Sequence, residues 1–273
     1  MSVPPTRQMA APTFRPRSTT EIVDAAFQIL RAHYGQFVMC AAIAHVPLLL
    51  MQLLVIGDPT RFLSGGAADA LAAGQGMLRA GLQSFLASWI TFTLMSAVLL
   101  VCASQAYLGD PVDVGTAVRR TLPRLPQLIA TGLIRFLYLM LGLMLFIFPV
   151  LYVLAQNFAV TTTVVLENAG VVSAFTRSAE LSKGRKWHIL NTLGLAGLIY
   201  LVLVFGVAMI FALAGNFVLR TVGSAVATVL VYPVVAITET LLYYDARIQS
   251  EGLDIELMTN ALAPDSPAAT PAS

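Results

Sequence analysis

The feature of this sequence that most restricts its fold is a series of long apolar segments with almost no charge. The segment 189–213 contains no charged residue, and it is longer than the roughly 20 residues that a helix needs to cross a bilayer. Of the 273 residues, 58% are hydrophobic and only 11% are charged, whereas soluble domains carry about 25% charged residues. A chain of this composition has too little polar surface for water, so we expect an all-α, polytopic membrane protein.

Breaks of Gly, Pro and charged residues divide the apolar sequence into six predicted transmembrane helices. Pro47 lies inside the first and is expected to kink it, because proline removes a helical hydrogen bond. Pro149 is expected to reverse the chain between the third and the fourth. The stretch 57–76 is expected to be a loop with some helix. The predicted spans are about 37–56, a segment within 82–107, 127–148, 150–166, 189–213 and 222–244.

Three shorter segments are amphipathic and too polar to cross the bilayer. Apolar residues recur at helical spacing on one face of 18–34, 113–122 and 171–181, and charged or polar residues occupy the other face. Ser18 and Glu21 have the spacing of a capping box. We expect three helices that lie along the cytoplasmic interface of the membrane.

Each amphipathic segment also carries the pattern V-x-x-A-[FV], beginning at Val23, Val114 and Val171, and each precedes a pair of spans. This order suggests a threefold internal repeat of interfacial helix, span and span. Chance matches in a chain rich in Ala and Val are the alternative. The spacing is irregular, which argues against a solenoid of fixed period.

The distribution of Lys and Arg predicts the orientation. One set of connections carries most of these residues, and the opposite set carries only Arg61, Arg79 and Arg220. Because cytoplasmic loops are enriched in Lys and Arg, both termini are expected in the cytoplasm. The residues on the cytoplasmic side would be Arg7, Arg15, Arg17, Arg31, Arg119, Arg120, Arg124, Arg177, Lys183, Arg185, Lys186 and Arg247.

No pattern of residues in the sequence is typical of an enzyme. His33, His45 and His188 are far apart and lack metal-binding spacing. His33 and His188 flank spans and are interpreted as interface anchors, while His45 lies within the first span and is expected to bond a neighbouring helix rather than carry protons. Cys40 and Cys102 lie in apolar segments and are interpreted as small buried hydrophobic residues rather than a disulfide or metal site. No cofactor and no metal site are predicted.

Two opposite charges fall within the predicted spans. Arg135 and Glu239 both lie in the cytoplasmic half of the membrane, where a lone charge is costly. We expect them to pair, directly or through Asn157 or water. The alternative is that each reaches the interface separately. His45 and Asn157 are the candidate polar lining of the bundle interior.

A basic group follows the third amphipathic segment and consists of Lys183, Arg185 and Lys186, closed by Trp187. These four residues are candidate contacts for lipid headgroups, since each basic residue near an anionic surface contributes about 1 kcal/mol. The alternative is that they only fix the topology.

Two motifs, E-N-A-G-V-V-S-A-F-T-R-S-A-E-L-S-K-G-R-K-W from Glu167 and Y-Y-D-A-R-I-Q-S-E-G-L-D from Tyr243, together resemble the membrane domain of glycerophosphoryl diester phosphodiesterases. The resemblance in layout covers about 18–258. In that family the phosphodiesterase activity belongs to a separate barrel of at least about 200 residues, for which this chain has no room. The resemblance therefore implies a stand-alone membrane domain without catalytic residues.

The resulting expectation is a non-catalytic module of the bacterial inner membrane that acts in assembly, partner binding or lipid contact. The alternative is a transporter or channel for a small solute or lipid, in which Pro47, Pro233, Asn157 and Arg135 line a path. A transmembrane domain at 18–258 would lie between disordered tails at 1–17 and 259–273. The expected partner is the lipid bilayer, with another membrane protein or a second copy of the chain as further candidates, and no nucleic acid.

Overall fold

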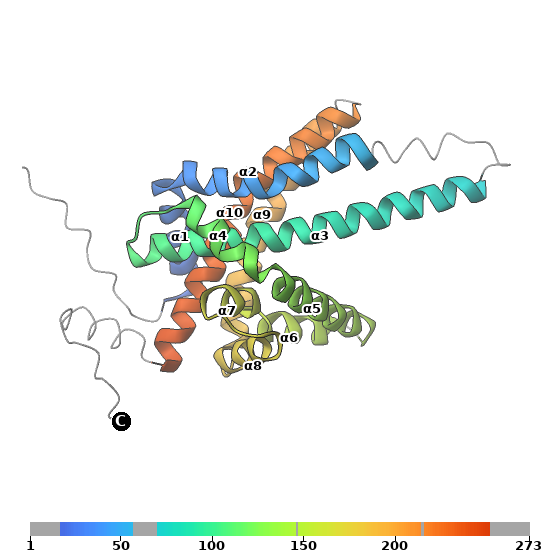
Figure 1. The fold of residues 1–273 in the computed structure, drawn as a ribbon. Coiled ribbons are helices and arrows are strands. Elements are labelled where there is room, and N and C mark those ends of the chain that lie inside the picture. The colour runs from blue at the N-terminus through green and yellow to red at the C-terminus, as the bar shows by residue number, and fades with distance from the viewer. Residues whose placement is uncertain (1–16, 57–69, 146, 214–215, 252–273) are drawn as a thin grey trace, which may run out of the picture.

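The computed structural model describes residues 17–56, 70–145, 147–213 and 216–251, which form helices joined by short turns, with no strand in these ranges. Six helical segments of the described chain are long and apolar enough to cross a membrane. The prediction of an all-α polytopic bundle is therefore confirmed (Figure 1). The predicted tail 259–273, the predicted tail 1–17 apart from Arg17, and residues 57–69 of the stretch 57–76 lie outside the described residues.

The helices follow one another with short connections. Their bounds are α1 (Thr19–Ala32), α2 (Tyr34–Met51) with a π turn η1 (Gln52–Ile56), α3 (Ala70–Leu108), α4 (Val114–Thr121), a 3₁₀ turn η4 (Leu122–Arg124), α5 (Leu125–Leu145), α6 (Ile147–Gln156), α7 (Val160–Leu166), α8 (Val171–Leu181), α9 (Lys186–Ala212) and α10 (Phe217–Glu251).

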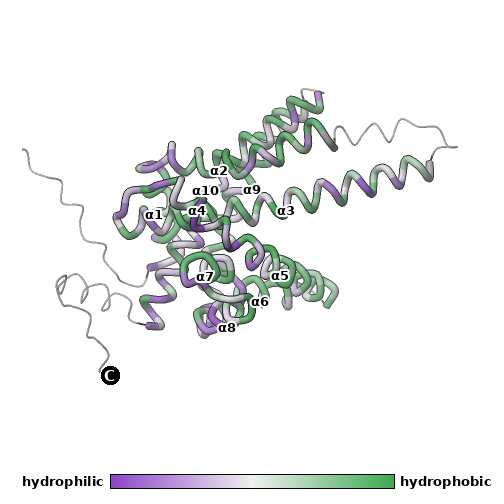
Figure 2. Tube along the Cα trace, in the orientation of Figure 1, coloured by the Kyte–Doolittle hydropathy of each residue, from purple (hydrophilic) through white to green (hydrophobic). Residues whose placement is uncertain are grey.

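The long helices run alternately toward and away from one end of the bundle. α1 and α4 lie at this end, and α10 also finishes there (Figure 1). We call it the basic end, because the short helices and the connections here carry most of the described Lys and Arg residues. Figure 2 shows hydrophilic residues concentrated there, whereas the long helices are largely apolar.

The short helices begin where their sequences predict. The Oγ of Ser18 accepts a hydrogen bond from the backbone N–H of Glu21 at 3.4 Å, and Glu21 Oε2 accepts from the N–H of Ser18 at 2.8 Å, which confirms the capping box of α1. Asp113 caps α4 by accepting from the N–H groups of Gly115 and Thr116. Each cap satisfies backbone groups that a helix start leaves unpaired.

The apolar faces of α1, α4 and α8 pack against the bundle. α1 contacts α10 and α9, α4 contacts α3, and α8 contacts α7 and α5. The alanine of the V-x-x-A-[FV] pattern is fully buried in all three helices, as Ala26, Ala117 and Ala174. The three helices thus use the same position of the pattern, and each is followed by two spans, as the proposed repeat requires.

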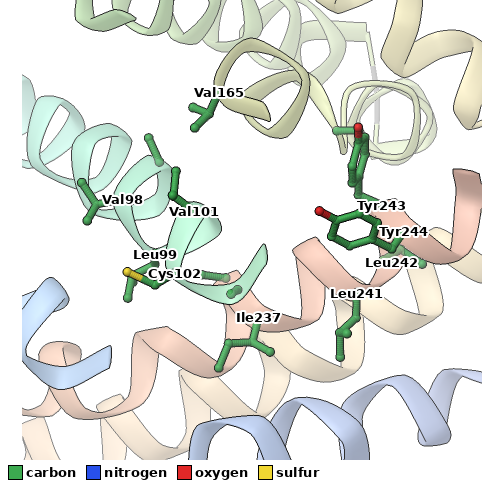
Figure 3. Packing of buried hydrophobic residues seen from close by; sticks show 14 of the residues in the cluster. Val98, Leu99, Val101, Cys102, Val165, Ile237, Leu241, Leu242, Tyr243 and Tyr244 are labelled. Carbon is green, nitrogen blue, oxygen red and sulfur yellow. The ribbon is translucent and has the colours of Figure 1, made fainter. Parts of the chain in front are cut away.

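The buried core lies in the half of the bundle nearest the basic end, around α10. This helix packs against α9, α2, α1 and α3. Ile237 and Leu241 of α10 and Val101 and Cys102 of α3 belong to one buried hydrophobic cluster, part of which Figure 3 shows. The free thiols of Cys40 and Cys102 are both fully buried, with their Sγ atoms 2.9 Å apart, so they pack α2 against α3.

Outside this core, the spans present apolar side chains outward. On α9 these include Leu201, Phe205 and Ile210, of which Ile210 is 68% exposed. Exposed apolar area of this extent requires a lipid environment. α3 has 39 residues, which at a rise of about 1.5 Å per residue is about 58 Å. It is longer than a bilayer core, as predicted for the second span, and its helix already begins at Ala70 within the expected loop.

The fourth span is broken, which the sequence analysis did not predict. α6 ends at Gln156 and α7 begins at Val160. The fully buried Ser178 of α8 bridges the break: its Oγ donates to the carbonyl of Gln156 at 2.8 Å and accepts from the N–H of Ala159 at 3.1 Å. Both backbone groups lack a helical partner, so Ser178 replaces the missing bonds.

The helix predicted at 113–122 ends as expected: α4 finishes at Thr121, and the turn η4, which contains Pro123, joins it to α5 without a gap. Arg17, the last residue of the predicted tail 1–17, is held to the bundle, since its backbone N–H donates to Asp245 Oδ1 at 2.9 Å.

Candidate functional site

The two sequence motifs meet at the basic end in a group of charged and hydrogen-bonded side chains. Arg177 of α8 donates from Nε to Glu167 Oε2 at 3.0 Å and also pairs with Glu251 of α10. Arg247 Nε lies 2.9 Å from Glu251 Oε2, and the hydroxyl of Tyr243 donates to Glu167 Oε1 at 2.6 Å. We call these five residues the paired cluster. It joins the end of α7, α8 and the end of α10.

Charges in the paired cluster balance one another. Burial acts to lower the pKa of Arg177, but the hydrogen bonds and negative charges of Glu251 and Glu167 outweigh burial and raise this pKa above its ordinary value. Arg177 and Glu251 each keep 27% of their side-chain surface exposed, so solvent screens the attraction and each pair contributes about 1 kcal/mol at most. The cluster fastens helices and presents no uncompensated acid or base.

The second motif also binds the start of the described chain. Asp245 Oδ2 accepts from Gln249 Nε2 at 2.7 Å and lies 3.8 Å from His188 Nε2, while its Oδ1 accepts from Arg17. Arg185 Nη1 donates to the carbonyl of Ala246 at 2.8 Å. The residues after Tyr244 therefore anchor both α9 and the segment before α1.

The four candidate headgroup contacts have different surroundings. Arg185 is engaged with α10, and the Nζ of Lys186 lies 3.5 Å from the ring centroid of Tyr152. Lys183 is exposed, and Trp187 is 72% exposed. Lys183 and Trp187 thus remain available to an outside partner, whereas the other two side chains hold the protein together.

A cavity of about 280 Å³ lies between α3, α5, α7 and α10. We call it the intramembrane cavity, because its lining belongs to the spanning helices. Aromatic and aliphatic side chains form most of its wall, and a few hydroxyl groups and one guanidinium supply polarity. The lining residues are Trp89, Phe92, Thr93, Ser96, Leu128, Thr131, Gly132, Arg135, Phe136, Leu139, Val160, Thr161 and Tyr232.

Arg135 lines this cavity, and Glu239 of α10 lies close enough to interact with it electrostatically. Within the described ranges the two side chains form no direct ion pair. Glu239 Oε1 and Thr162 Oγ1 are buried without a hydrogen-bond partner there. Pairing through Asn157 or water stays a prediction.

His45 and Asn157, the other predicted polar residues, do not line the intramembrane cavity. His45 packs edge-to-face against Phe92, with ring centroids 6.3 Å apart, and Phe92 in turn contacts Tyr232 at 5.5 Å. His45 therefore lies behind the aromatic wall of the cavity. Asn157 is buried at the break between α6 and α7 and is not among the residues that line the cavity.

Sequence reasoning missed Ser96, Thr131 and Tyr232, which line the cavity, and Glu167, whose carboxylate links Arg177 to Tyr243. One signal was available: Thr131 and Arg135 are four residues apart and share a helix face. The contacts of Glu167 join residues 76 positions apart in sequence, and only the tertiary fold brings them together.

The chain matches no protein-family model, no curated protein and no solved structure.

Proposed function

We propose that this chain is a non-catalytic, lipid-contacting module of the bacterial inner membrane, of the kind that the glycerophosphoryl diester phosphodiesterase membrane domain represents. One observation carries the proposal: the residues of both motifs are used in the paired cluster. Their acids and bases satisfy one another and hold α7, α8 and α10 in place. Such an arrangement serves the shape of the basic end and leaves no oriented nucleophile and base.

In this proposal the basic end and both termini face the cytoplasm. The excess of Lys and Arg at this end supports that orientation. Reporter fusions test it: a reporter at Ser273 should be active only in the cytoplasm, and one inserted near Gly66 only outside. Reversed signals would contradict the orientation.

The non-catalytic role is tested with the purified protein in liposomes. We expect no hydrolysis of glycerophosphodiesters above that of empty liposomes, in the presence or absence of divalent cations. Hydrolysis that Glu167→Ala or Tyr243→Phe abolishes, in protein that remains folded by thermal melting, would overturn the proposal.

A transporter or channel is the second candidate, and the intramembrane cavity favours it. Of the four residues expected to line a path, Arg135 alone lies among the residues that line this cavity, so a path would run along α5 rather than past Pro47, Pro233 and Asn157. A flux screen in proteoliposomes with anionic solutes tests this candidate. Flux that falls in Arg135→Gln but not in Arg79→Gln would support it, and no flux in the wild-type protein would exclude it for the solutes used.

A further inference from the structure

A second cluster of arginines at the basic end surrounds a hollow of about 400 Å³. It lies between α4, η4 and the start of α5 on one side and the end of α7 with the connection to α8 on the other. We call it the arginine hollow. Its lining residues are Arg119, Arg120, Pro123, Arg124, Gln127, Val164, Asn168 and Ala169.

The three arginines have no carboxylate partner within the described ranges. Arg120 Nη2 donates to the carbonyl of Leu166 at 3.1 Å, and Arg124 Nη1 donates to the carbonyl of Arg120 at 2.8 Å. Both acceptors are uncharged. The Arg119 side chain makes no hydrogen bond or ion pair there, although it acts electrostatically on Asp113, which is occupied as the cap of α4.

Three guanidinium groups around one hollow repel one another. Arg120 and Arg124 interact unfavourably, and no acidic residue lines the hollow to offset the repulsion. An anion bound between them would remove this cost, since the attraction between opposite charges near a protein surface is several times stronger than in bulk water. The hollow is therefore built for a negatively charged group.

The lining residues indicate which chemical groups the ligand carries. Guanidinium groups bind phosphate oxygens through paired, charge-assisted hydrogen bonds. The amides of Gln127 and Asn168 can bond hydroxyl or ester oxygens, and Pro123 and Val164 provide apolar contact. The hollow lies next to the start of the apolar part of α5, which begins beyond Gln127. A phosphate carried on a lipid matches this combination.

We propose that the arginine hollow binds the phosphate-bearing headgroup of an anionic membrane lipid. The inference rests on the lipid-contacting role proposed above and assigns it to a site other than Lys183 and Trp187. The two arginines that also donate to the backbone are held in place, so the site is partly organised before the lipid arrives. Arg119 supplies a third guanidinium group to the hollow from α4.

The test is lipid binding by the full chain in detergent, followed by native mass spectrometry during titration with phosphatidylglycerol. Because each basic residue contributes on the order of fivefold in affinity, Arg120→Gln/Arg124→Gln should weaken the tightest binding on the order of twentyfold. Arg119→Gln breaks no bond within the protein and should weaken it about fivefold, which keeps the test valid if the double variant fails to fold.

The matched control for Arg119→Gln is Arg31→Gln, which removes one exposed charge at the same end and should change the affinity less than twofold. Equal losses in the control and hollow variants would mean diffuse attraction and overturn the site. Unchanged binding in the hollow variants would overturn the site but leave the lipid-contacting role standing. No binding by the wild-type protein would overturn both.

Two further titrations identify the source of the phosphate. Phosphatidylcholine, which is zwitterionic, should bind at least tenfold more weakly than phosphatidylglycerol. Inorganic phosphate at the same concentration should not displace the lipid. If inorganic phosphate binds the wild-type protein as tightly as phosphatidylglycerol and is lost in Arg119→Gln, the hollow holds a free anion and the lipid assignment is wrong.

Discussion

The paired cluster and the arginine hollow lie at the same end of the bundle and use arginine in opposite ways. In the paired cluster, Arg177 and Arg247 bind carboxylates from other turns or helices. In the hollow, among the described residues, Arg120 and Arg124 donate only to backbone carbonyls, and Arg119 has no hydrogen-bond or ion-pair partner. The first arrangement uses its charge to join helices, and the second leaves its charge available to a ligand.

The difference shows that a basic end is more than a topology signal. Counts of Lys and Arg treat all of these residues alike. Their partners separate them, because a guanidinium that is already bound to a carboxylate has little to gain from a phosphate, whereas an unpaired one has much. Substitutions in the two regions should therefore affect different properties: stability in one and lipid binding in the other.

The largest loss of stability should come from Ser178→Ala, next to Arg177 on α8. It removes the side chain that bonds the N–H of Ala159 and the carbonyl of Gln156, and a buried unsatisfied group costs about 1–3 kcal/mol. We expect a loss of about 2–3 kcal/mol and an apparent Tm in detergent lower by roughly 4–12 °C. The control is Ser173→Ala on the exposed face of α8, which should shift Tm by less than about 2 °C. Equal shifts in the two variants would mean that the break needs no cap.

Arg177→Gln should have the next largest effect. It leaves Glu167 and Glu251 close together without their shared cation. Removing one partner of a buried pair costs about 3–5 kcal/mol, and partial exposure reduces this to about 1–2 kcal/mol. Arg119→Gln is the counterpart in the hollow and should be neutral or slightly stabilising, because it relieves repulsion. A larger loss of stability in Arg119→Gln than in Arg177→Gln would reverse the comparison.

Tyr243→Phe should destabilise the protein by about 1 kcal/mol, because it removes the hydroxyl that donates to Glu167 while the ring stays in the core. Thermal melting in detergent measures the loss. The control Tyr34→Phe alters a more exposed ring and should leave Tm unchanged. If Tyr243→Phe also leaves Tm unchanged, Arg177 alone holds Glu167.

Acid should lower the stability of α4, the helix that carries Arg119 and Arg120, by a small amount through its cap Asp113. The hydroxyl of Thr116 and the N–H groups of Gly115 and Thr116 lower the pKa of Asp113 below its ordinary value of 3.8. A carboxylate with a lowered pKa stabilises the fold above that ordinary value, and the contribution is lost as pH falls through the folded-state pKa. We expect a melting difference between wild type and Asp113→Asn that is present at pH 6 and is lost as the pH falls below the ordinary value of 3.8 and through the lowered pKa of Asp113. A difference that persists in acid would mean that the charge of Asp113 is irrelevant to α4.

Much of the fold could be predicted because membrane helices are recognisable from the length of their apolar segments. Caps such as Ser18 and Asp113 were also predictable, because they act on residues within three positions. The break after Gln156 could not be predicted, since its stabilising group, Ser178, comes from a different helix. For the charged residues too, local features could be predicted and contacts with other helices could not. The basic segment at Lys183 was visible in the sequence, but the commitment of Arg185 and Lys186 to internal contacts depends on α10 and Tyr152.

The arginine hollow was not predicted as a site for a related reason. Arg119, Arg120 and Arg124 looked like ordinary residues of a positive loop. Their significance comes from the lack of a carboxylate partner for them in the part of the chain that the structure describes, and from the approach of the α7–α8 connection, where Asn168 has a positive φ of 58°. Both features depend on the tertiary fold and could not be predicted from the local sequence.

The most direct test of this division of roles is thermal melting of three proteins with and without phosphatidylglycerol: wild type, Arg177→Gln and Arg120→Gln/Arg124→Gln. Arg177→Gln should melt lower than wild type but gain as much stability from the lipid. Arg120→Gln/Arg124→Gln should melt close to wild type without lipid, apart from the loss of its backbone bonds, and should gain little from the lipid. If the lipid stabilises the hollow variant as strongly as wild type, or no longer stabilises Arg177→Gln, the two regions do not have the separate roles assigned to them.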